Sequence, residues 1–242
     1  KPGEEAATLC DLAAAQKSLG KLAEAKLDLQ KALAIYSGRS VVDPAGELRM
    51  RADLAACYEA GGDAAGALKQ YAAAADLAAQ LKDAAAETRL RSSWGLLLQK
   101  QGNLEDAQKQ YDVAVKICMG LPNEPLTEAT LRNNLGALLQ EQGKGKEALE
   151  QFDKALALFA KQNDDAGQAR ALYNIALVHE SETRNDEAAA AYEQSLALRK
   201  KLKDGPGAAR VLDNLALLFA AAGKTERAKE CRDEAERLRK GP

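Results

Sequence analysis

Apolar residues recur along the chain at the spacing of one face of an α-helix. Leu90, Trp94, Leu97 and Leu98, for example, stand at i, i+4, i+7 and i+8. This spacing follows the period of 3.6 residues that an amphipathic helix shows when it buries one side. Similar stripes follow one another through the sequence, with glycine or proline between many of them. The pattern predicts a chain that is built almost wholly of helices.

The helical pattern returns at a near-constant interval. Six alanines stand 40 to 42 residues apart, and the residue types around each alanine repeat with it. Such self-similarity indicates one supersecondary unit built several times, in which the stacking of neighbouring copies buries the apolar faces. The marker alanines are Ala25, Ala67, Ala107, Ala148, Ala188 and Ala228.

Small and large residues occupy fixed places within each copy. The fourth copy shows them as Leu135, Gly136, Leu139, Gly143, Ala148, Phe152 and Ala155. These residue types at these spacings resemble the tetratricopeptide repeat, a helix–turn–helix unit, and the resemblance covers essentially the whole chain. The intervals exceed the 34 residues usual in that family. Repeats of this length resemble those of kinesin light chains and of the Pins/LGN class of adaptors.

The resemblance implies a right-handed, all-α solenoid of six helix–turn–helix repeats that forms a single domain over residues 1–242. Small residues in the first helix are expected where the second helix crosses it closely. Glycine is expected after the first helix because it adopts a left-handed conformation without steric cost. The last predicted helix, residues 225–241, is so polar that it is expected to form a solvated cap. The repeats are expected at about 6–42, 48–84, 88–125, 129–165, 169–205 and 209–242.

Composition and charge narrow the range of functions. Charged residues make up 29% of the chain, the net charge is −2 and aromatic residues make up 4%. Neither a basic surface for nucleic acid nor a platform for base stacking is therefore expected. No run of 18 apolar residues occurs, so the sequence predicts no insertion into a membrane.

Catalytic and metal-binding constellations do not stand out in the sequence. The four cysteines lie in different copies without a CxxC pair, which is typical of apolar fillers in a reducing compartment and indicates a cytoplasmic protein. His179, the one histidine, stands in a core register of its copy. The segment GKGKE at residues 143–147 lacks the spacing of a phosphate-binding loop. We therefore expect no enzymatic activity, no metal and no cofactor.

Function is expected on the concave side of the solenoid, which this family lines with the first helix of each repeat. Arg170 with Asn174, and Arg210 with Asn214, stand four residues apart and so share a helix face in consecutive copies. Arginine offers a planar fork for carboxylates, and asparagine offers a donor and an acceptor for a peptide backbone. This arrangement resembles the groove of Pins/LGN-class adaptors and implies that an extended, acidic segment of a partner protein binds there. The predicted groove residues are Arg49, Arg89, Asn133, Asn134, Arg170, Tyr173, Asn174, Leu177, Arg210, Asn214 and Leu217.

Two other interpretations of these residues stay open. The arginines could instead pair with acids of neighbouring helices, such as Asp165 or Asp204, while the asparagines stiffen the superhelix. The whole array could also have a mainly architectural role. In that case it would self-associate, or pack with another solenoid, through its convex or terminal faces.

Co-chaperones of the same superfamily use a two-carboxylate clamp to hold the free C-terminus of a chaperone. Asn133, Asn174 and Arg210 match three positions of that clamp in type or charge. Ala137 and Asn214 depart from the two others, so this particular activity is not favoured.

Overall fold

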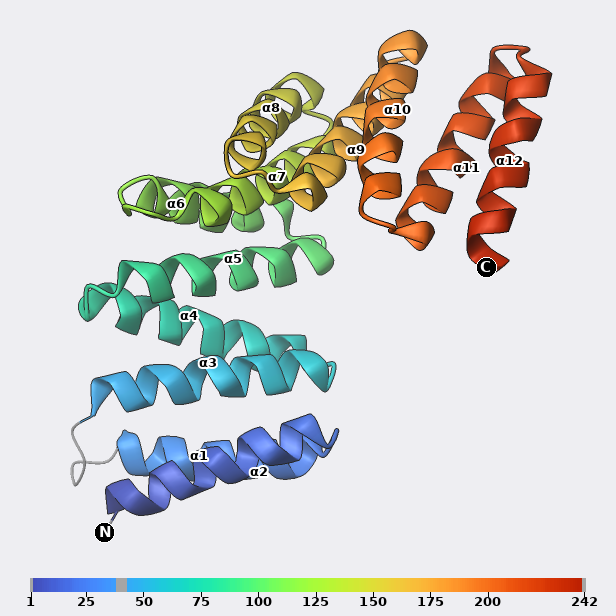
Figure 1. Cartoon of the computed structure of the whole chain (residues 1–242). Helices are drawn as coiled ribbons and strands as arrows, with labels where there is room; N and C mark the ends of the chain where they lie inside the picture. Colours follow the sequence, from blue (N-terminus) through green and yellow to red (C-terminus); the bar gives the residue numbers. More distant parts are fainter. Residues whose placement is uncertain (1, 38–42, 241–242) are drawn as a thin grey trace. The chain divides into compact units, whose positions relative to one another are not determined.

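The computed structural model describes residues 2–37 and 43–240, and within these ranges every regular element is an α-helix (Figure 1). The chain divides into two compact units, Lys1–Pro122 and Asn123–Pro242. The helices of the first unit are α1 (Pro2–Ser18), α2 (Leu22–Tyr36), α3 (Pro44–Ala60), α4 (Ala64–Gln80), α5 (Ala84–Lys100) and α6 (Leu104–Cys118). Those of the second unit are α7 (Pro125–Glu141), α8 (Gly145–Lys161), α9 (Asp165–Ser181), α10 (Asn185–Lys201), α11 (Gly205–Ala221) and α12 (Thr225–Lys240).

Consecutive helices form pairs, and the pairs stack within each unit. An odd-numbered helix packs on the even-numbered helix that follows it, and within a unit that helix packs on the first helix of the next pair. This arrangement confirms the predicted all-α repeat solenoid of helix–turn–helix units. A single domain over residues 1–242 stays a prediction, and residues 1, 42 and 242, which bound the expected domain and its first repeat, lie outside the described residues.

Glycine and other small residues shape each pair as the sequence predicts. Gly143, after the first helix of the fourth pair, has a φ of 75°, and the fifth pair places Thr183 in this left-handed conformation with a φ of 59°. Gly136 lies where the second helix crosses, because a Cβ built on it would stand 2.7 Å from Cε1 of Phe152. The marker alanines are all buried, with Ala148 and Ala188 at 0% exposure.

An acidic residue caps the first helix of most pairs. In α11, for example, the carboxylate of Asp204 accepts a hydrogen bond from the backbone N–H of Gly207 at 2.9 Å. This bond satisfies one of the amide groups that a helix N-terminus leaves without an intrahelical partner. The same contact is made by Asp43, Asp83 and Asp164 at the starts of α3, α5 and α9.

Three pairs contain a polar connection that the sequence reasoning missed. In the fourth pair Arg132 donates from Nε to Glu128 at 2.7 Å and from Nη1 to Gln151 of α8 at 3.0 Å. Arg132 is 9% exposed, so its charge is satisfied inside the pair. Equivalent sets are Glu47, Arg51 and Gln70 in the second pair and Glu87, Arg91 and Gln110 in the third.

The last helix is the most polar of the second unit. In α12 only Ala228 and Ala235 are buried, while Cys231 and Leu238 are partly buried. Few apolar groups remain on its outer side, which agrees with the solvated cap expected from the sequence.

Candidate binding surface of the second unit

The predicted groove residues lie on the first helices of the pairs. Arg49 on α3 and Arg89 on α5 are exposed in the first unit. In the second unit the predicted residues occupy α7, α9 and α11, and the structure connects several of them directly. Leu217 on α11 is 63% exposed, whereas Leu177 and Asn134 are partly buried.

Two asparagines of this surface bond to neighbouring repeats. The Nδ2 of Asn174 donates to Oδ1 of Asn133 at 3.1 Å, which joins α9 to α7. The Nδ2 of Asn214 donates to the hydroxyl oxygens of Tyr173 at 3.0 Å and of Tyr192 at 3.1 Å. Both amides therefore hold the repeats together, as the interpretation of stiffening asparagines anticipated.

Tyr192 lies beneath this surface and connects Glu180, Asn214 and Tyr173. It is fully buried, and its hydroxyl donates to Oε2 of Glu180 at 2.7 Å. Burial of the phenol, followed by its bond to the Glu180 carboxylate, raises the pKa of Tyr192 above its ordinary value. The ring remains neutral at physiological pH and packs against Tyr173 with centroids 5.6 Å apart.

Tyr173 supports two arginines. The guanidinium carbon of Arg210 lies 4.8 Å from the centroid of the Tyr173 ring, and that of Arg199 lies 6.0 Å from it. Cations over an aromatic face are attracted by the ring quadrupole. Because Asn214 holds the hydroxyl of Tyr173, the ring offers both arginines a fixed support.

Arg170 and Arg210 line one cavity together with Arg199. This cavity has a volume of ≈ 280 Å³ and lies between α9, the end of α10 and the start of α11. Asp204 is the one acid in its wall, so three cations face one anion. The lining residues are Ala166, Ala169, Arg170, Arg199, Leu202, Asp204 and Arg210.

The acids that could have neutralised Arg170 and Arg210 are engaged elsewhere. Asp204 pairs with Nη1 of Arg199 at 2.6 Å, and Asp165 pairs with Lys201 at 2.6 Å. The hydrogen bond from the Gly207 backbone N–H, together with the bond from Arg199, lowers the pKa of Asp204 below its ordinary value. Arg170 and Arg210 form no salt bridge with these two acids, although the charge of Arg210 also contributes to the lowered pKa of Asp204.

Arg199 was not among the predicted site residues, although it is unusual for its register in the repeat. The corresponding residue of each earlier pair is buried and mostly apolar, and Arg199 itself is 9% exposed. Comparison of this one register across the copies would have shown a cation in a core position. The corresponding residues are Tyr36, Ala78, Cys118 and Phe159, at the same intervals of 40 to 42 residues.

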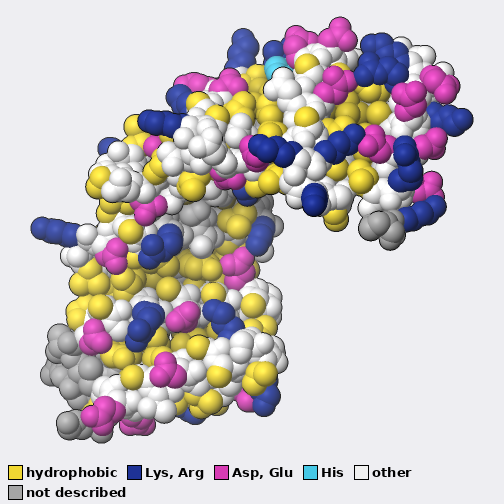
Figure 2. Space-filling model, in the orientation of Figure 1, with side chains coloured by type: hydrophobic (Ala, Val, Ile, Leu, Met, Phe, Trp, Pro, Cys, Tyr) yellow, Lys and Arg dark blue, Asp and Glu magenta, His cyan; other side chains and the backbone are white. Residues whose placement is uncertain are grey.

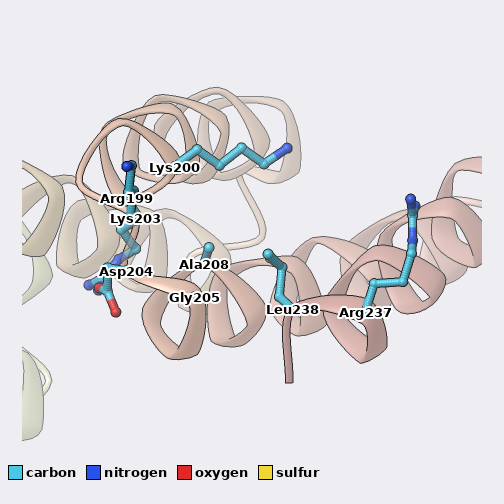
Figure 3. A pocket seen from close by; sticks show the side chains of 8 residues that line it. All are labelled: Arg199, Lys200, Lys203, Asp204, Gly205, Ala208, Arg237 and Leu238. Carbon is cyan, nitrogen blue, oxygen red and sulfur yellow. The ribbon is translucent and has the colours of Figure 1, made fainter. Parts of the chain in front are cut away.

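A larger cavity lies beside the first and shares two residues with it. Its volume is ≈ 520 Å³, and Figure 3 shows Arg199 and Asp204 at one end, Arg237 at the other, and Leu238 and Ala208 between them. Lys200, in the wall, pairs with Glu234 at 2.7 Å. The complete lining consists of Arg199, Lys200, Lys203, Asp204, Gly205, Ala208, Arg237 and Leu238.

The remaining candidate groups show no sign of reactive chemistry. Cys10, Cys57 and Cys118 are buried and form no disulfide, and burial raises the pKa of Cys10 and Cys57. Burial lowers the pKa of His179, a partly buried residue of α9. No group of three or more metal-ligating side chains comes together in the described parts of the chain.

The surface carries no dominant charge. Figure 2 shows basic, acidic and apolar side chains interspersed over the visible face of each unit. Among the helices of residues 2–37 and 43–240, none combines the length and the apolar character required to cross a bilayer.

Comparison with known proteins supports the repeat assignment. A profile described as tetratricopeptide repeat matches residues 126–201 and 167–241, and a second profile with the same description matches residues 6–38. No curated protein matches the chain.

Solved structures show the same fold. BtubC (BKLC) from P. vanneervenii is 24% identical with a TM-score of 0.76, and the match covers 93% of this chain and 90% of that one. A putative kinesin light chain with TPR-like repeats from Podosopora anserina is 19% identical with a TM-score of 0.69, covering 84% and 98%. The apo form of RapI is 14% identical with a TM-score of 0.78, covering 98% of both chains.

Proposed function

Because the chain belongs to the tetratricopeptide repeat family, we propose that it is a non-enzymatic scaffold that binds an extended, acidic segment of a partner protein. Proteins with this fold are generally non-catalytic and bind protein partners. The finer assignment concerns the surface of α7, α9 and α11 in the second unit. Four free cysteines support a reducing, cytoplasmic location.

One observation carries the proposal. Arg170 and Arg210 stand in the same register of adjacent first helices, are exposed, and line one cavity. Asp165 pairs with Lys201, Asp204 pairs with Arg199, and Asp213 pairs with Arg239. Among the described residues neither guanidinium forms a salt bridge, and Arg210 acts on Asp204 only through its charge. Both groups are therefore available to carboxylates of a bound segment.

The other predicted residues have separate tasks in this proposal. Asn174 and Asn214 hold the repeats and Tyr173 in position, so they orient the arginines. Leu177 and the exposed Leu217 contact apolar side chains of the partner, and Asn134 bonds to its backbone. On the first unit, Arg49 and Arg89 provide a second, weaker contact for the same kind of segment.

A labelled peptide in which glutamate alternates with alanine tests the proposal by fluorescence anisotropy. Loss of one charge-assisted contact costs on the order of 1–3 kcal/mol, or roughly five- to hundred-fold in affinity. The double substitution Arg170→Glu and Arg210→Glu is expected to abolish binding while helicity by circular dichroism is unchanged. Affinity of the native chain should also fall as salt rises, because the arginines are partly solvated.

A matched control changes the same charge elsewhere in the second unit. Lys146 on α8 and Lys229 on α12 are exposed on second helices, and their joint replacement by glutamate should leave most of the affinity. Equal weakening by both double variants would show that net charge alone governs binding. Unchanged affinity in the arginine variant would place recognition outside this surface.

Self-assembly is the second candidate function, and one observation favours it. Leu12, Leu19 and Leu27 on the first helix pair and its turn are 47%, 72% and 52% exposed. Large apolar side chains left exposed can mark association surfaces. A concentration-dependent mass in sedimentation equilibrium that disappears on Leu19→Glu would support assembly, and a constant monomer mass would exclude it.

A further inference from the structure

Arg199 differs in residue type from the residues at the same register of the earlier pairs. The same register holds Tyr36, Ala78, Cys118 and Phe159 in the earlier pairs, and all four are buried. An arginine in such a position costs desolvation energy that an apolar side chain does not. Its Nε is also buried without a hydrogen-bond partner. Departures from a local rule that bring no evident gain in stability are expected at functional sites.

Because an arginine stands in this register, a third guanidinium lines the cavity of Arg170 and Arg210. Together with Asp204, the three arginines give the cavity wall a net charge of +2. The equivalent registers of the first unit hold Arg49, Arg89 and the capping Asp83, but Ala78 replaces the third arginine. That set sums to +1, so the two units present different charges at matching positions.

We infer that the cavity between α9, α10 and α11 binds the phosphate of a phosphorylated serine or threonine in the partner segment. This inference rests on the proposed function and adds to it the chemical class that the segment carries. A phosphomonoester bears about −1.5 to −2 charges near neutral pH, which matches a net charge of +2 better than one carboxylate does. Planar guanidinium forks also suit the spacing of phosphate oxygens.

Two of the three arginines are held in place before any ligand binds. Nη1 of Arg199 is fixed by Asp204 at 2.6 Å, and Arg210 lies over the Tyr173 ring at 4.8 Å. The carboxylate of Asp204 is occupied by Arg199 and by the Gly207 N–H, which reduces its repulsion of an incoming anion. A cavity of ≈ 280 Å³ admits a phosphate group without rearrangement of the helices.

Three labelled peptides of identical sequence test the inference, with phosphoserine, glutamate or serine at one central position. The native chain is expected to bind the phosphoserine peptide at least about tenfold more tightly than the glutamate peptide. The variant Arg199→Phe restores the residue type of Phe159 and should fold, because Gly207 stands beneath it as Gly167 stands beneath Phe159. It is expected to lose the preference for phosphoserine, so that the phosphoserine and glutamate peptides bind with similar affinity.

A conservative variant separates charge from packing. Arg199→Lys retains the cation and should retain most of the preference, whereas Arg199→Phe should not. In a second measurement, inorganic phosphate is titrated into the native chain while the Nε–H resonances of its arginines are recorded by NMR. Shifts of arginine resonances that are absent in Arg199→Phe would place the phosphate at this cavity.

The outcomes distinguish this inference from the proposed function. If the glutamate peptide binds through Arg170 and Arg210 but phosphoserine gives no gain, only the phosphate assignment is wrong. A preference for phosphoserine that survives Arg199→Phe would also overturn it. If none of the peptides binds and inorganic phosphate shifts no arginine resonance, both proposals fail.

Discussion

Replacement of Arg199 by phenylalanine should stabilise the second unit, because it returns a core register to the residue type that the fold uses elsewhere. In the fourth pair Phe159 is 1% exposed, and its ring lies directly over Gly167 of α9. In the fifth pair the guanidinium of Arg199 lies in the same way over Gly207 of α11. The glycine leaves the room that an aromatic ring needs.

The expected change in the free energy of unfolding follows from the interactions that the substitution adds and removes. Burial of a phenylalanine side chain contributes about 1.5–3 kcal/mol. The ion pair of Arg199 with Asp204 joins side chains that are 11% and 38% exposed, and a pair open to solvent on one side contributes about 1 kcal/mol. Removal of the buried, unpartnered Nε adds about 1 kcal/mol in favour of the variant. The net expectation is a gain of about 1.5–3 kcal/mol.

Urea denaturation followed by circular dichroism measures this difference. The reverse exchange, Phe159→Arg, is a matched control, since Asp164 caps α9 as Asp204 caps α11. It should reduce the free energy of unfolding by a similar amount. If Arg199→Phe instead lowers stability by more than about 1 kcal/mol, Arg199 is a structural residue, and the argument from its cost is wrong.

Three further predictions concern other groups of the fold. Arg132→Ala leaves Glu128 without its cation inside the fourth pair and should lower the free energy of unfolding, measured in urea, by about 2–4 kcal/mol. A loss below about 0.5 kcal/mol would contradict the role given to this ion pair. The pKa of Asp204 is lowered in the folded state, so its stabilising contribution is present above the unfolded pKa of about 4 and is lost as pH falls through the folded pKa. Asp204→Asn should therefore make the free energy of unfolding less dependent on pH in acid. The same pH dependence in the variant and the native chain would refute this. Burial raises the pKa of Cys57, so its reaction with a disulfide reagent at pH about 8 should be much slower than that of a small thiol and should accelerate in urea.

Features fixed by a single residue type were predictable from the sequence. A left-handed turn favours glycine, so Gly143 marks the end of a first helix without knowledge of the packing. Thr183 adopts the same conformation although its side chain is β-branched, so its residue type alone does not mark the turn. A close crossing requires a small residue, and Gly136 marks one. These constraints act within one pair, where sequence spacing determines spatial position.

Contacts between pairs were not predictable in the same way. Asn174 donates to Asn133 across 41 residues, and whether it does so or faces a ligand depends on side-chain rotamers and on the offset of two helices. The spacing of Glu128 and Arg132 indicates an ion pair on one helix. Their contact with Gln151, however, depends on how α8 crosses α7.

The six copies also separate structural polar groups from candidate functional ones. Arg51, Arg91 and Arg132 each come with a glutamate and a glutamine of the same pair, so the cation and its partners occur together. At Leu172 and Leu212, which take the register of these arginines, the register of the glutamine holds alanine or cysteine. In the first pair Leu9 stands with Asp28, and the Asp28 carboxylate accepts hydrogen bonds from Gln16 and Lys31. A polar group introduced for stability therefore brings its own compensation.

Arg199 brings no such set. Its one ion-pair partner, Asp204, belongs to a capping register that holds aspartate in other pairs as well, at Asp43, Asp83 and Asp164. The aspartate is thus explained by the cap, and the arginine adds a charge whose Nε stays unsatisfied. Arg199 is a buried cation in a register that holds other residue types in the four earlier pairs and the exposed Arg239 in the sixth. Its one ion-pair partner is already required by the cap, and it lies beside two exposed arginines. The proposed anion from outside the chain would explain this arrangement.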